Sequence, residues 1–243
     1  MPTSTATSHP RYAALLAEWC ELLRRSQQAP SNGGATGMEL GMDLGMGLRT
    51  GSGKDPSPYG RDLLDRWGEP QRRYHTLDHL VAVLDRATEL TAYAGDPDAV
   101  ALAAWFHDAV YRPDRSENEE RSAHLAERAL PEAGVSQART AEVARLVRLT
   151  VTHDPAEGDR NGEVLCDADL AVLAGDPAAY AAYAAAVREE YGFVPDDEFR
   201  ASRAAVLHQL LALPRLFRTS YGHDHWEHTA RRNLRTELDL LEA

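Results

Sequence analysis

A histidine and an aspartate stand side by side inside an apolar stretch. The segment 103–111 reads Ala-Ala-Trp-Phe-His-Asp-Ala-Val-Tyr, and apart from His107 and Asp108 this is the composition of a buried helix. Burying either polar group costs several kcal/mol unless it is paired or bound. Imidazole and carboxylate groups are common ligands of divalent metals. The pair therefore predicts one half of a metal site, and the rest of the chain must supply the other half.

Two further groups of histidines could join it. His75 and His79 are four residues apart at the expected start of a helix, so both lie near one face. Either could reach a metal, although such a pair is also common at helix caps and on surfaces. His153 follows the expected end of another helix, where the helix dipole alone favours a histidine.

Two carboxylates interrupt the apolar stretch Leu165-Cys166-Asp167-Ala168-Asp169-Leu170. An unpaired buried carboxylate would have to take up a proton. A cation partner, either a metal or an arginine, is the natural account of Asp167 and Asp169. The residues leave both partners open.

Helical spacing of apolar residues and capping signals then place the elements that must position these groups. Expected start signals are Thr76, Asp96-Pro97, the capping box Ser116–Glu119, Ser136 and Asp176-Pro177. The helices are expected at about 9–27, 60–67, 77–93, 97–109, 117–130, 137–152, 163–174, 177–191, 196–212 and 224–242. We find no convincing alternating strand pattern with hairpin turns. The chain is therefore predicted to be all-α, a single-domain helical bundle.

The composition divides the chain further. We expect residues 1–28 to contribute an N-terminal helix that packs on the domain, and residues 59–243 to form the domain itself. Between them, residues 29–58 are rich in Gly and Met, and glycine at this density opposes a packed element, so we expect a flexible insertion.

Bulk properties exclude some classes of function. A net charge of −12 argues against general nucleic-acid binding, which depends on clustered Lys and Arg. No apolar run is long enough to cross a bilayer, and the N-terminus lacks a secretory pattern. Only Cys20 and Cys166 occur, which suits a reducing compartment. We therefore expect a cytoplasmic protein without a membrane partner.

The ordered series His79, His107-Asp108 and Asp169 resembles the signature of the HD superfamily of metal-dependent phosphohydrolases. The match is closest to a branch of predicted phosphohydrolases with largely uncharacterised substrates, and it covers about 60–240 together with the first helix. The segments that carry it are Arg72–His79, Trp105–Tyr111, Asn118–Ala123, Asp167–Leu170, Arg188–Tyr191 and Ala230–Leu234.

This resemblance implies an HD-type helical bundle and one divalent metal held by His79, His107, Asp108 and Asp169. The choices of His79 over His75 and of Asp169 over Asp167 rest on the family context. The donor set suits Mn, Fe, Co, Ni, Zn or Mg. The implied activity is hydrolysis of a phosphate ester, such as a nucleotide or a related small phosphorylated molecule, by a metal-activated water.

A phosphate ester also needs cations and proton-transfer groups around it. Arg72, Arg73, Arg188 and Arg231 are the candidate substrate-binding residues, each with a surface ion pair as the alternative. The candidates for catalysis beside Asp108 are His75, His153 and Glu119, the last of which competes with its expected capping role.

Two other functions remain in view. Some relatives with the HD fold are diiron oxygenases, which need extra histidines between the His-Asp pair and the last aspartate. His124 and His153 fall in that interval, although His124 lies early in its helix. The third possibility is a non-catalytic protein that keeps the metal for binding or structure. We also expect that the chain can form a homodimer.

Overall fold

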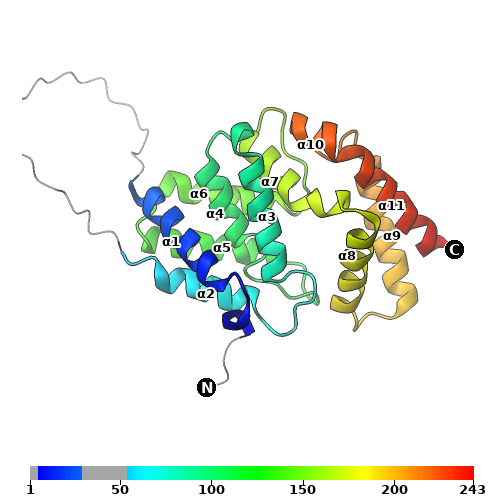
Figure 1. Ribbon diagram of the computed structural model, residues 1–243, viewed down its shortest axis with the longest axis horizontal. Helices are drawn as coiled ribbons and strands as arrows, with labels where there is room; N and C mark the ends of the chain where they lie inside the picture. Colours follow the sequence, from blue (N-terminus) through cyan, green and yellow to red (C-terminus); the bar gives the residue numbers. More distant parts are fainter. Residues whose placement is uncertain (1–4, 29–53) are drawn as a thin grey trace, which may run out of the picture.

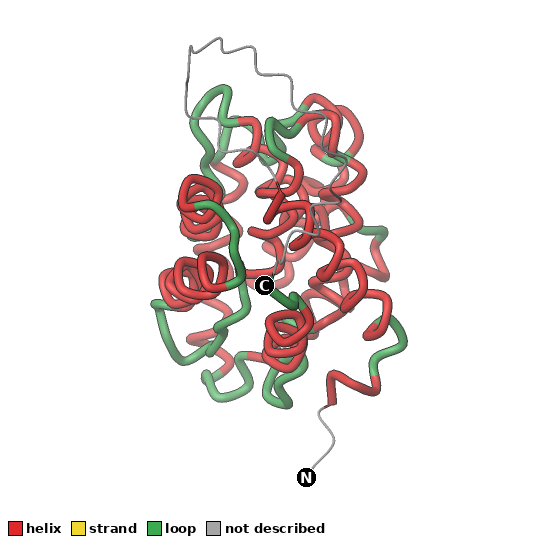
Figure 2. Tube along the Cα trace, turned by 90° about the vertical axis from the view of Figure 1, so that its left-hand side faces the viewer, coloured by secondary structure: helices red, strands yellow, loops and turns green. Residues whose placement is uncertain are grey.

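The computed structural model describes residues 5–28 and 54–243, and the regular structure in these ranges is entirely helical (Figures 1 and 2). The helices are α1 Tyr12–Gln28, α2 Ser57–Trp67, α3 Leu77–Glu89, α4 Pro97–Phe106, α5 Asn118–Glu132, α6 Gln137–Leu149, α7 Arg160–Leu170, α8 Pro177–Glu190, α9 Asp196–Ala212, α10 Ser220–His225 and α11 Glu227–Glu242. The short 3-10 helices are η1 Thr5–Ser8, η2 Thr91–Tyr93 and η3 Ala171–Ala174. The all-α prediction is confirmed.

Several helices begin where the capping residues predicted. The side chains of Asp96, Ser136 and Asp176 each accept a backbone N–H two or three residues further on, at the starts of α4, α6 and α8. Pro97 and Pro177 occupy the first positions of α4 and α8, where no backbone N–H is needed. These starts are therefore fixed by local chemistry.

The predicted capping box of Ser116 and Glu119 is wrong. Helix α5 begins at Asn118, and its N-cap makes no side-chain hydrogen bond. The Asn118 amide instead accepts the N–H of Arg112 at 3.0 Å and donates to the C=O of Arg112 at 2.9 Å. Asn118 therefore closes the loop before the helix, which replaces the cap.

The predicted helix at 224–242 is two helices, α10 and α11, which meet at Trp226. The buried carboxylate of Glu227 turns back and accepts the N–H groups of Leu216 and Phe217 at 3.0–3.1 Å. This contact ties the start of α11 to the preceding loop, which a continuous helix would not allow.

Helix α4 lies in the middle of the part formed by α1–α7 (Figure 1). It packs against α1, α3, α5, α6 and α7. A helix that is apolar all round belongs in a core, and α4 buries Ala99, Val100, Leu102, Ala103, Ala104, Trp105 and Phe106. Its C-terminal end delivers His107 and Asp108 into the interior.

The N-terminal helix α1 packs on this core through Trp19. The Trp19 ring lies edge-on to Trp105 at 5.3 Å and to Phe106 at 6.0 Å between centroids. Its indole Nε1 donates to the C=O of Pro56 at 2.9 Å. Helix α1 thereby also fixes the segment that enters α2.

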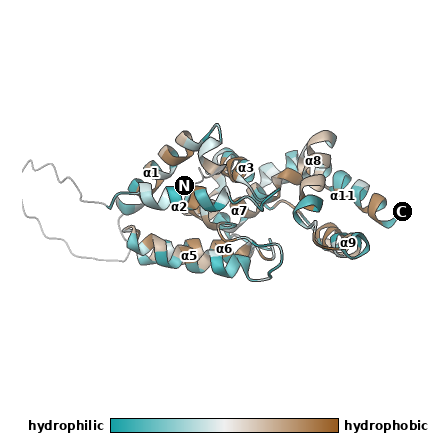
Figure 3. Cartoon of the chain, turned by 90° about the horizontal axis from the view of Figure 1, so that it is seen from below, coloured by the Kyte–Doolittle hydropathy of each residue, from teal (hydrophilic) through white to brown (hydrophobic). Residues whose placement is uncertain are grey.

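Helices α8, α9 and α11 lie at one end of the molecule, away from α1 and α2 (Figures 1 and 3). Helix α9 packs along α11, and an ion pair between Arg203 and Glu237 joins them at 2.7 Å. Leu207 is the one residue of α9 that is fully buried. Much of α9 therefore remains accessible.

Residues 29–53 of the predicted 29–58 insertion lie outside the described residues, and Ser57 and Pro58 form the first turn of α2. Within the described ranges, no single helix has both the length and the apolar character needed to cross a membrane. Two consecutive segments, Arg160–Ala174 and Pro177–Glu190, have the required length and apolar character only when taken together, and the chain bends by 105° between them.

Candidate metal centre

Three helices bring the predicted metal ligands together. His79 lies in the first turn of α3, His107 and Asp108 follow α4, and Asp169 lies near the end of α7. Helices α3, α4 and α7 all pack against one another. The junction is therefore a fixed part of the core.

The ligand atoms converge. His79 Nε2 is 3.1 Å from Asp169 Oδ1 and 3.3 Å from His107 Nε2, and His107 Nε2 is 3.6 Å from Asp169 Oδ1. Donor atoms that each lie about 2.1 Å from one ion are about 3.0 Å apart at right angles and about 3.4 Å apart in a tetrahedron. The observed spacings of 3.1, 3.3 and 3.6 Å are close to these values.

Asp108 joins the same histidines from a different direction. Its Oδ2 is 3.1 Å from His107 Nε2 and 3.8 Å from His79 Nε2. The group whose ligand atoms all lie within 4.8 Å of one another contains His79, His107 and Asp169 but not Asp108. The two carboxylates therefore flank the imidazole pair and do not contact each other.

Neighbouring groups fix the ring of His107. Its Nδ1 is 2.8 Å from the C=O of Ala104, so Nδ1 carries the hydrogen and Nε2 faces the cluster. The Trp67 ring packs at 5.3 Å from the imidazole, and its Nε1 donates to the C=O of Trp105 at 3.0 Å. Orientation of a ligand by such outer contacts is typical of metal sites.

The electrostatics of the cluster favour a cation. Burial lowers the pKa of His79. Burial also opposes the charge on His107, but Asp108 and Asp169 raise the pKa of its imidazole to about 9. The charge of His107 in turn lowers the pKa of both carboxyls against the effect of burial. Two carboxylates thus stabilise positive charge at the point where the imidazoles meet.

The structure separates Asp167 from Asp169. The Asp167 carboxylate accepts the N–H of Arg218 at 2.7 Å, the N–H of Thr219 at 2.8 Å and the hydroxyl of Thr219 at 2.6 Å. Burial nevertheless raises the pKa of Asp167 to about 6. Asp167 thus holds the two residues that precede α10, while Asp169 faces the histidines.

The structure also separates His75 from His79. His75 Nδ1 is 2.5 Å from Glu190 Oε2, and its Nε2 is 3.8 Å from Asp108 Oδ2. The imidazole stacks on the Tyr111 ring at 4.1 Å between centroids. His75 lies beside the cluster, next to Asp108.

Sequence reasoning missed Glu190. Its fully buried carboxylate accepts the N–H of Arg73 at 3.0 Å and those of Tyr74 and His75 at 3.3 Å. These bonds and His75 lower the pKa of Glu190 to about 2, although burial opposes the shift. Glu190 stood in the Arg188–Tyr191 motif, but no local pattern indicates a partner more than one hundred residues away.

His153 flanks the second carboxylate. Its Nε2 is 2.8 Å from Asp169 Oδ2, and its backbone has φ 49°, the left-handed region that few non-glycine residues adopt. The loop after α6 thereby turns this imidazole toward α7. Each carboxylate ligand has one outer histidine, His75 beside Asp108 and His153 beside Asp169.

Arg72 is committed to the backbone. Its buried guanidinium donates to the C=O of His75 at 2.9 Å, of Asp108 at 2.8 Å and of Ala109 at 3.3 Å. Burial lowers the pKa of Arg72. The side chain joins the loop before α3 to the segment that carries Asp108.

The other predicted substrate-binding arginines also have protein partners. Arg73 pairs with Glu189 at 2.8 Å, and Arg188 pairs with Asp196 at 2.5 Å. Arg231 donates to the carboxylate of Glu227 and to the C=O groups of Leu211, in the last turn of α9, and of Leu213, which follows α9. The structure does not bring these guanidinium groups to the histidine cluster.

Arg86 was not among the predicted residues. With His79 and Asp169 it lines a cavity of about 180 Å³. Arg86 follows His79 by seven residues, two turns of one helix, and this spacing would have placed both on one face. Its guanidinium pairs with Glu89 at 2.7 Å and lies over the Trp226 ring.

Glu119 and His124 do not join the cluster. Glu119 is half-buried on α5 and contacts none of the ligands. The exposed His124 imidazole pairs with Glu120 at 2.9 Å on the same helix. Of the histidines between Asp108 and Asp169, His153 alone reaches the ligands.

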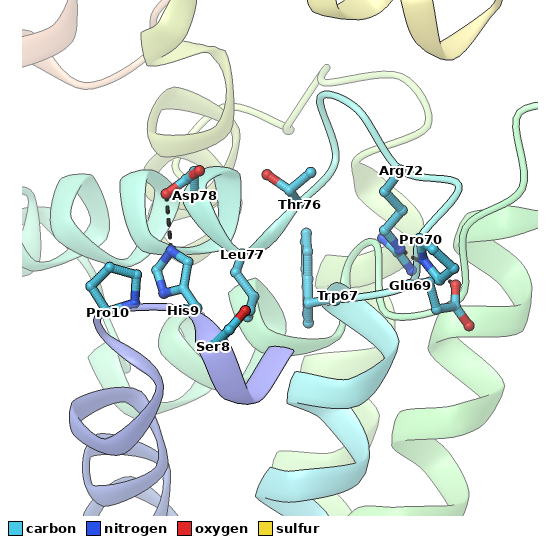
Figure 4. Close-up of a pocket in the computed structure, with 11 residues that line it drawn as sticks. Ser8, His9, Pro10, Trp67, Glu69, Pro70, Arg72, Thr76, Leu77 and Asp78 are labelled. Atoms are coloured by element: carbon cyan, nitrogen blue, oxygen red, sulfur yellow. Dashed lines mark hydrogen bonds and ion pairs between the residues drawn. The ribbon is translucent and has the colours of Figure 1, made fainter. Parts of the chain in front are cut away.

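A separate cavity of about 440 Å³ lies against η1 (Figure 4). His9 and Asp78 bond across it at 3.0 Å, while Trp67 and Arg72 form another wall. None of the four ligands lines this cavity. It is therefore distinct from the metal centre.

Comparison of the chain with protein-family models, curated proteins and solved structures gives no match. The function is therefore inferred from the geometry and chemistry of the site.

Proposed function

We propose that the protein is a metal-dependent hydrolase that acts on a phosphate ester of a small molecule, such as a nucleotide. His79, His107, Asp108 and Asp169 would hold the ion. The observation that carries this proposal is the convergence of the His79, His107 and Asp169 donor atoms at 3.1–3.6 Å, with Asp108 Oδ2 at 3.1 Å and 3.8 Å from the two imidazoles. These residues come from α3, α7 and the segment that follows α4. Without a cation, the fold would bury the carboxylates of Asp108 and Asp169 beside the two imidazoles, at a considerable cost in desolvation free energy.

A divalent ion in such a site lowers the pKa of water to give a nucleophile and takes up charge on a phosphoryl oxygen. The two imidazoles and two carboxylates suit Mn, Fe, Co, Ni, Zn or Mg, so the donor set alone does not select the metal.

The surrounding residues supply orientation and proton transfer. Glu190 holds His75 through Nδ1, which leaves Nε2 directed toward Asp108. In this arrangement Nε2 can hold or release a proton next to the ligand set. His153 holds Asp169 Oδ2 and so leaves Oδ1 with His79. These are the roles we assign to the two outer histidines.

One observation favours a second function, that of a diiron oxygenase. The Asp169 carboxylate faces His79 with one oxygen and His153 with the other, which is how a carboxylate can connect two sites. His124, the other histidine needed in that interval, pairs with Glu120 instead. The hydrolase is therefore the better supported proposal.

The test is hydrolysis of a panel of nucleotides and small phosphoesters by the full-length protein loaded with each metal in turn. We expect activity that Asp108→Ala abolishes and that His124→Ala, a change at an exposed histidine outside the cluster, leaves intact. Equal activity in wild type and Asp108→Ala would refute the site. A content of two irons per chain together with oxygen uptake would favour the oxygenase over the hydrolase. Tight metal binding without turnover of any substrate would favour a non-catalytic metal-binding protein.

A further inference from the structure

A cavity of about 350 Å³ opens between α8, α9 and the loop before α3. It is lined by Tyr74, His75, Tyr183, Val187, Tyr191, Phe199, Ser202, Arg203 and Val206. Four of these lining side chains are aromatic rings, and two are valines. None of the four candidate metal ligands lines this space, and His75 is the one lining residue with a role in the proposed hydrolysis.

The cavity adjoins the metal centre. Its wall includes Tyr74, whose ring packs on the His79 imidazole at 4.8 Å, and His75, whose Nε2 is 3.8 Å from Asp108 Oδ2. A molecule with one group at the ligand cluster could therefore extend past His75 into the cavity.

The cavity offers no free positive charge. Its only guanidinium, that of Arg203, pairs with Glu237 at 2.7 Å and 3.1 Å and donates to the Tyr183 hydroxyl at 3.0 Å. Both charged groups are largely buried, at 9% and 12% exposure of the side chains. A second phosphate or a carboxylate would lose its hydration there without gaining a counter-charge.

Size and shape narrow the ligand further. Ligand cavities in proteins have volumes of about 300–1,000 Å³, so this one holds a single small group. Aromatic side chains bind flat rings through offset stacking and edge contacts. The exposed Ser202 hydroxyl can hydrogen-bond to the edge of such a ring.

We infer that this cavity binds the uncharged, planar part of the substrate, an aryl or heteroaryl ring joined to the phosphate ester. This inference rests on the proposed function, because the phosphate is placed at the metal centre. It deepens that function by excluding substrates with a second anionic group on the ring. Phe193 and Val206, which are 60% and 45% exposed, are then apolar groups near the entrance and in the wall of a ring-binding site.

Binding tests the cavity without hydrolysis. The full-length protein is titrated by calorimetry with adenosine, which is uncharged and carries a heteroaryl ring, and with ribose. Val206→Trp fills the cavity from an exposed position on α9, so the fold tolerates it. Ala205→Trp is the matched control, since the exposed Ala205 does not line the cavity.

We expect adenosine to bind and ribose not to bind, with affinity for adenosine at least tenfold weaker in Val206→Trp and unchanged in Ala205→Trp. Absence of adenosine binding, or equal affinity in both variants, would overturn the inference.

Hydrolysis gives the second readout. In Val206→Trp, kcat/KM should fall at least tenfold for phenyl phosphate and stay near wild type for glycerol phosphate. If Val206→Trp weakens adenosine binding but no ester is hydrolysed, the proposed function is rejected and the ring-binding role of the cavity stands. If Asp108→Ala abolishes hydrolysis but Val206→Trp affects phenyl phosphate and glycerol phosphate equally, the proposed function stands and the ring-binding role is rejected.

Discussion

The Nε2 atoms of His79 and His107 lie 3.3 Å apart in the interior, although 28 residues separate them in the chain. Two imidazoles at this distance cannot both be protonated, and each already has a carboxylate oxygen at 3.1 Å. The cation proposed for this site would offset the charge of both carboxylates and give each imidazole nitrogen a partner. Because His79 belongs to α3 and His107 follows α4, the site forms only when these two helices pack side by side.

The outer histidine of Asp169 gives a first prediction. His153→Ala removes the 2.8 Å contact to Asp169 Oδ2, so the carboxylate loses its orientation. We expect metal affinity to fall about ten- to a hundredfold, as is common for outer-contact losses, with the fold unchanged. Titration with Mn or Zn measures it, and His124→Ala should match wild type. Unchanged affinity in His153→Ala would remove His153 from the site.

A second prediction concerns Arg72. Arg72→Ala leaves three buried or half-buried carbonyls without their donor. Each unsatisfied buried acceptor costs about 1–3 kcal/mol, so we expect the unfolding free energy to drop by at least about 3 kcal/mol. Arg73→Ala, which removes a more exposed ion pair, should cost less than about 1 kcal/mol. Denaturant unfolding compares the two.

The same pair of variants tests whether Arg72 binds substrate. A stable Arg72→Ala protein with a raised KM would mean that the guanidinium serves the substrate more than the fold.

Glu190 provides a pH-dependent prediction. Its pKa is about 2 in the folded chain, below the value of about 4.3 for an unfolded glutamate. A depressed pKa stabilises the fold fully above about pH 4.3, and the contribution disappears as the pH falls toward 2. Because this gap is a little over two pKa units, the contribution is on the order of 3 kcal/mol.

Glu190→Gln should therefore be less stable than wild type at pH 7, and the difference should shrink as the pH falls from 4.3 to 2. Unfolding free energies at pH 7, 4 and 2.5 would show it. A difference that does not change with pH would mean that the charge of Glu190 is not the source.

The first turn of α10, which packs against Asp167, yields a packing prediction. A Cβ on Gly222 would lie 2.6 Å from Asp167 Oδ2 and 2.9 Å from Phe217 Cβ, both inside contact distance. Gly222→Ala should destabilise the fold by about 1–3 kcal/mol. At Gly95 a Cβ would approach nothing closer than 3.4 Å, so Gly95→Ala should be tolerated. Thermal unfolding of the two variants decides the point.

The sequence predicted those parts of the fold that depend on local chemistry. The apolar spacing and the N-caps at Asp96, Ser136 and Asp176 involve only residues close to one another in the chain, so the sequence alone reveals them. The start of α5 was predicted wrongly because Asn118 bonds to the loop before it, and this contact outweighs a capping box. The break at Trp226 depends on Glu227 reaching back to another segment.

The candidate site divides in the same way. The pairing of His79 with Asp169, expected from a resemblance, agrees with the geometry, while the metal itself remains a prediction. Glu190 escaped attention because its partners lie in the loop before α3, more than one hundred residues away. Arg86 was missed although its spacing from His79 is a local signal. The sequence could not show that acceptors within the protein compete with a substrate for the predicted arginines. In the fold, each of these guanidinium groups has a carboxylate or a carbonyl close by.

Arg72 fastens the loop before α3 to the segment after α4, so His75 and Asp108 must move together. The ring cavity, in contrast, takes its outer wall from α9, which is mostly accessible and has Leu207 as its one fully buried residue. Substitutions on that helix can reshape the cavity without disturbing the histidine cluster. If the chain acts as proposed, α9 sets selectivity apart from the residues that would carry the chemistry, so substitutions on α9 alone would change which substrates fit.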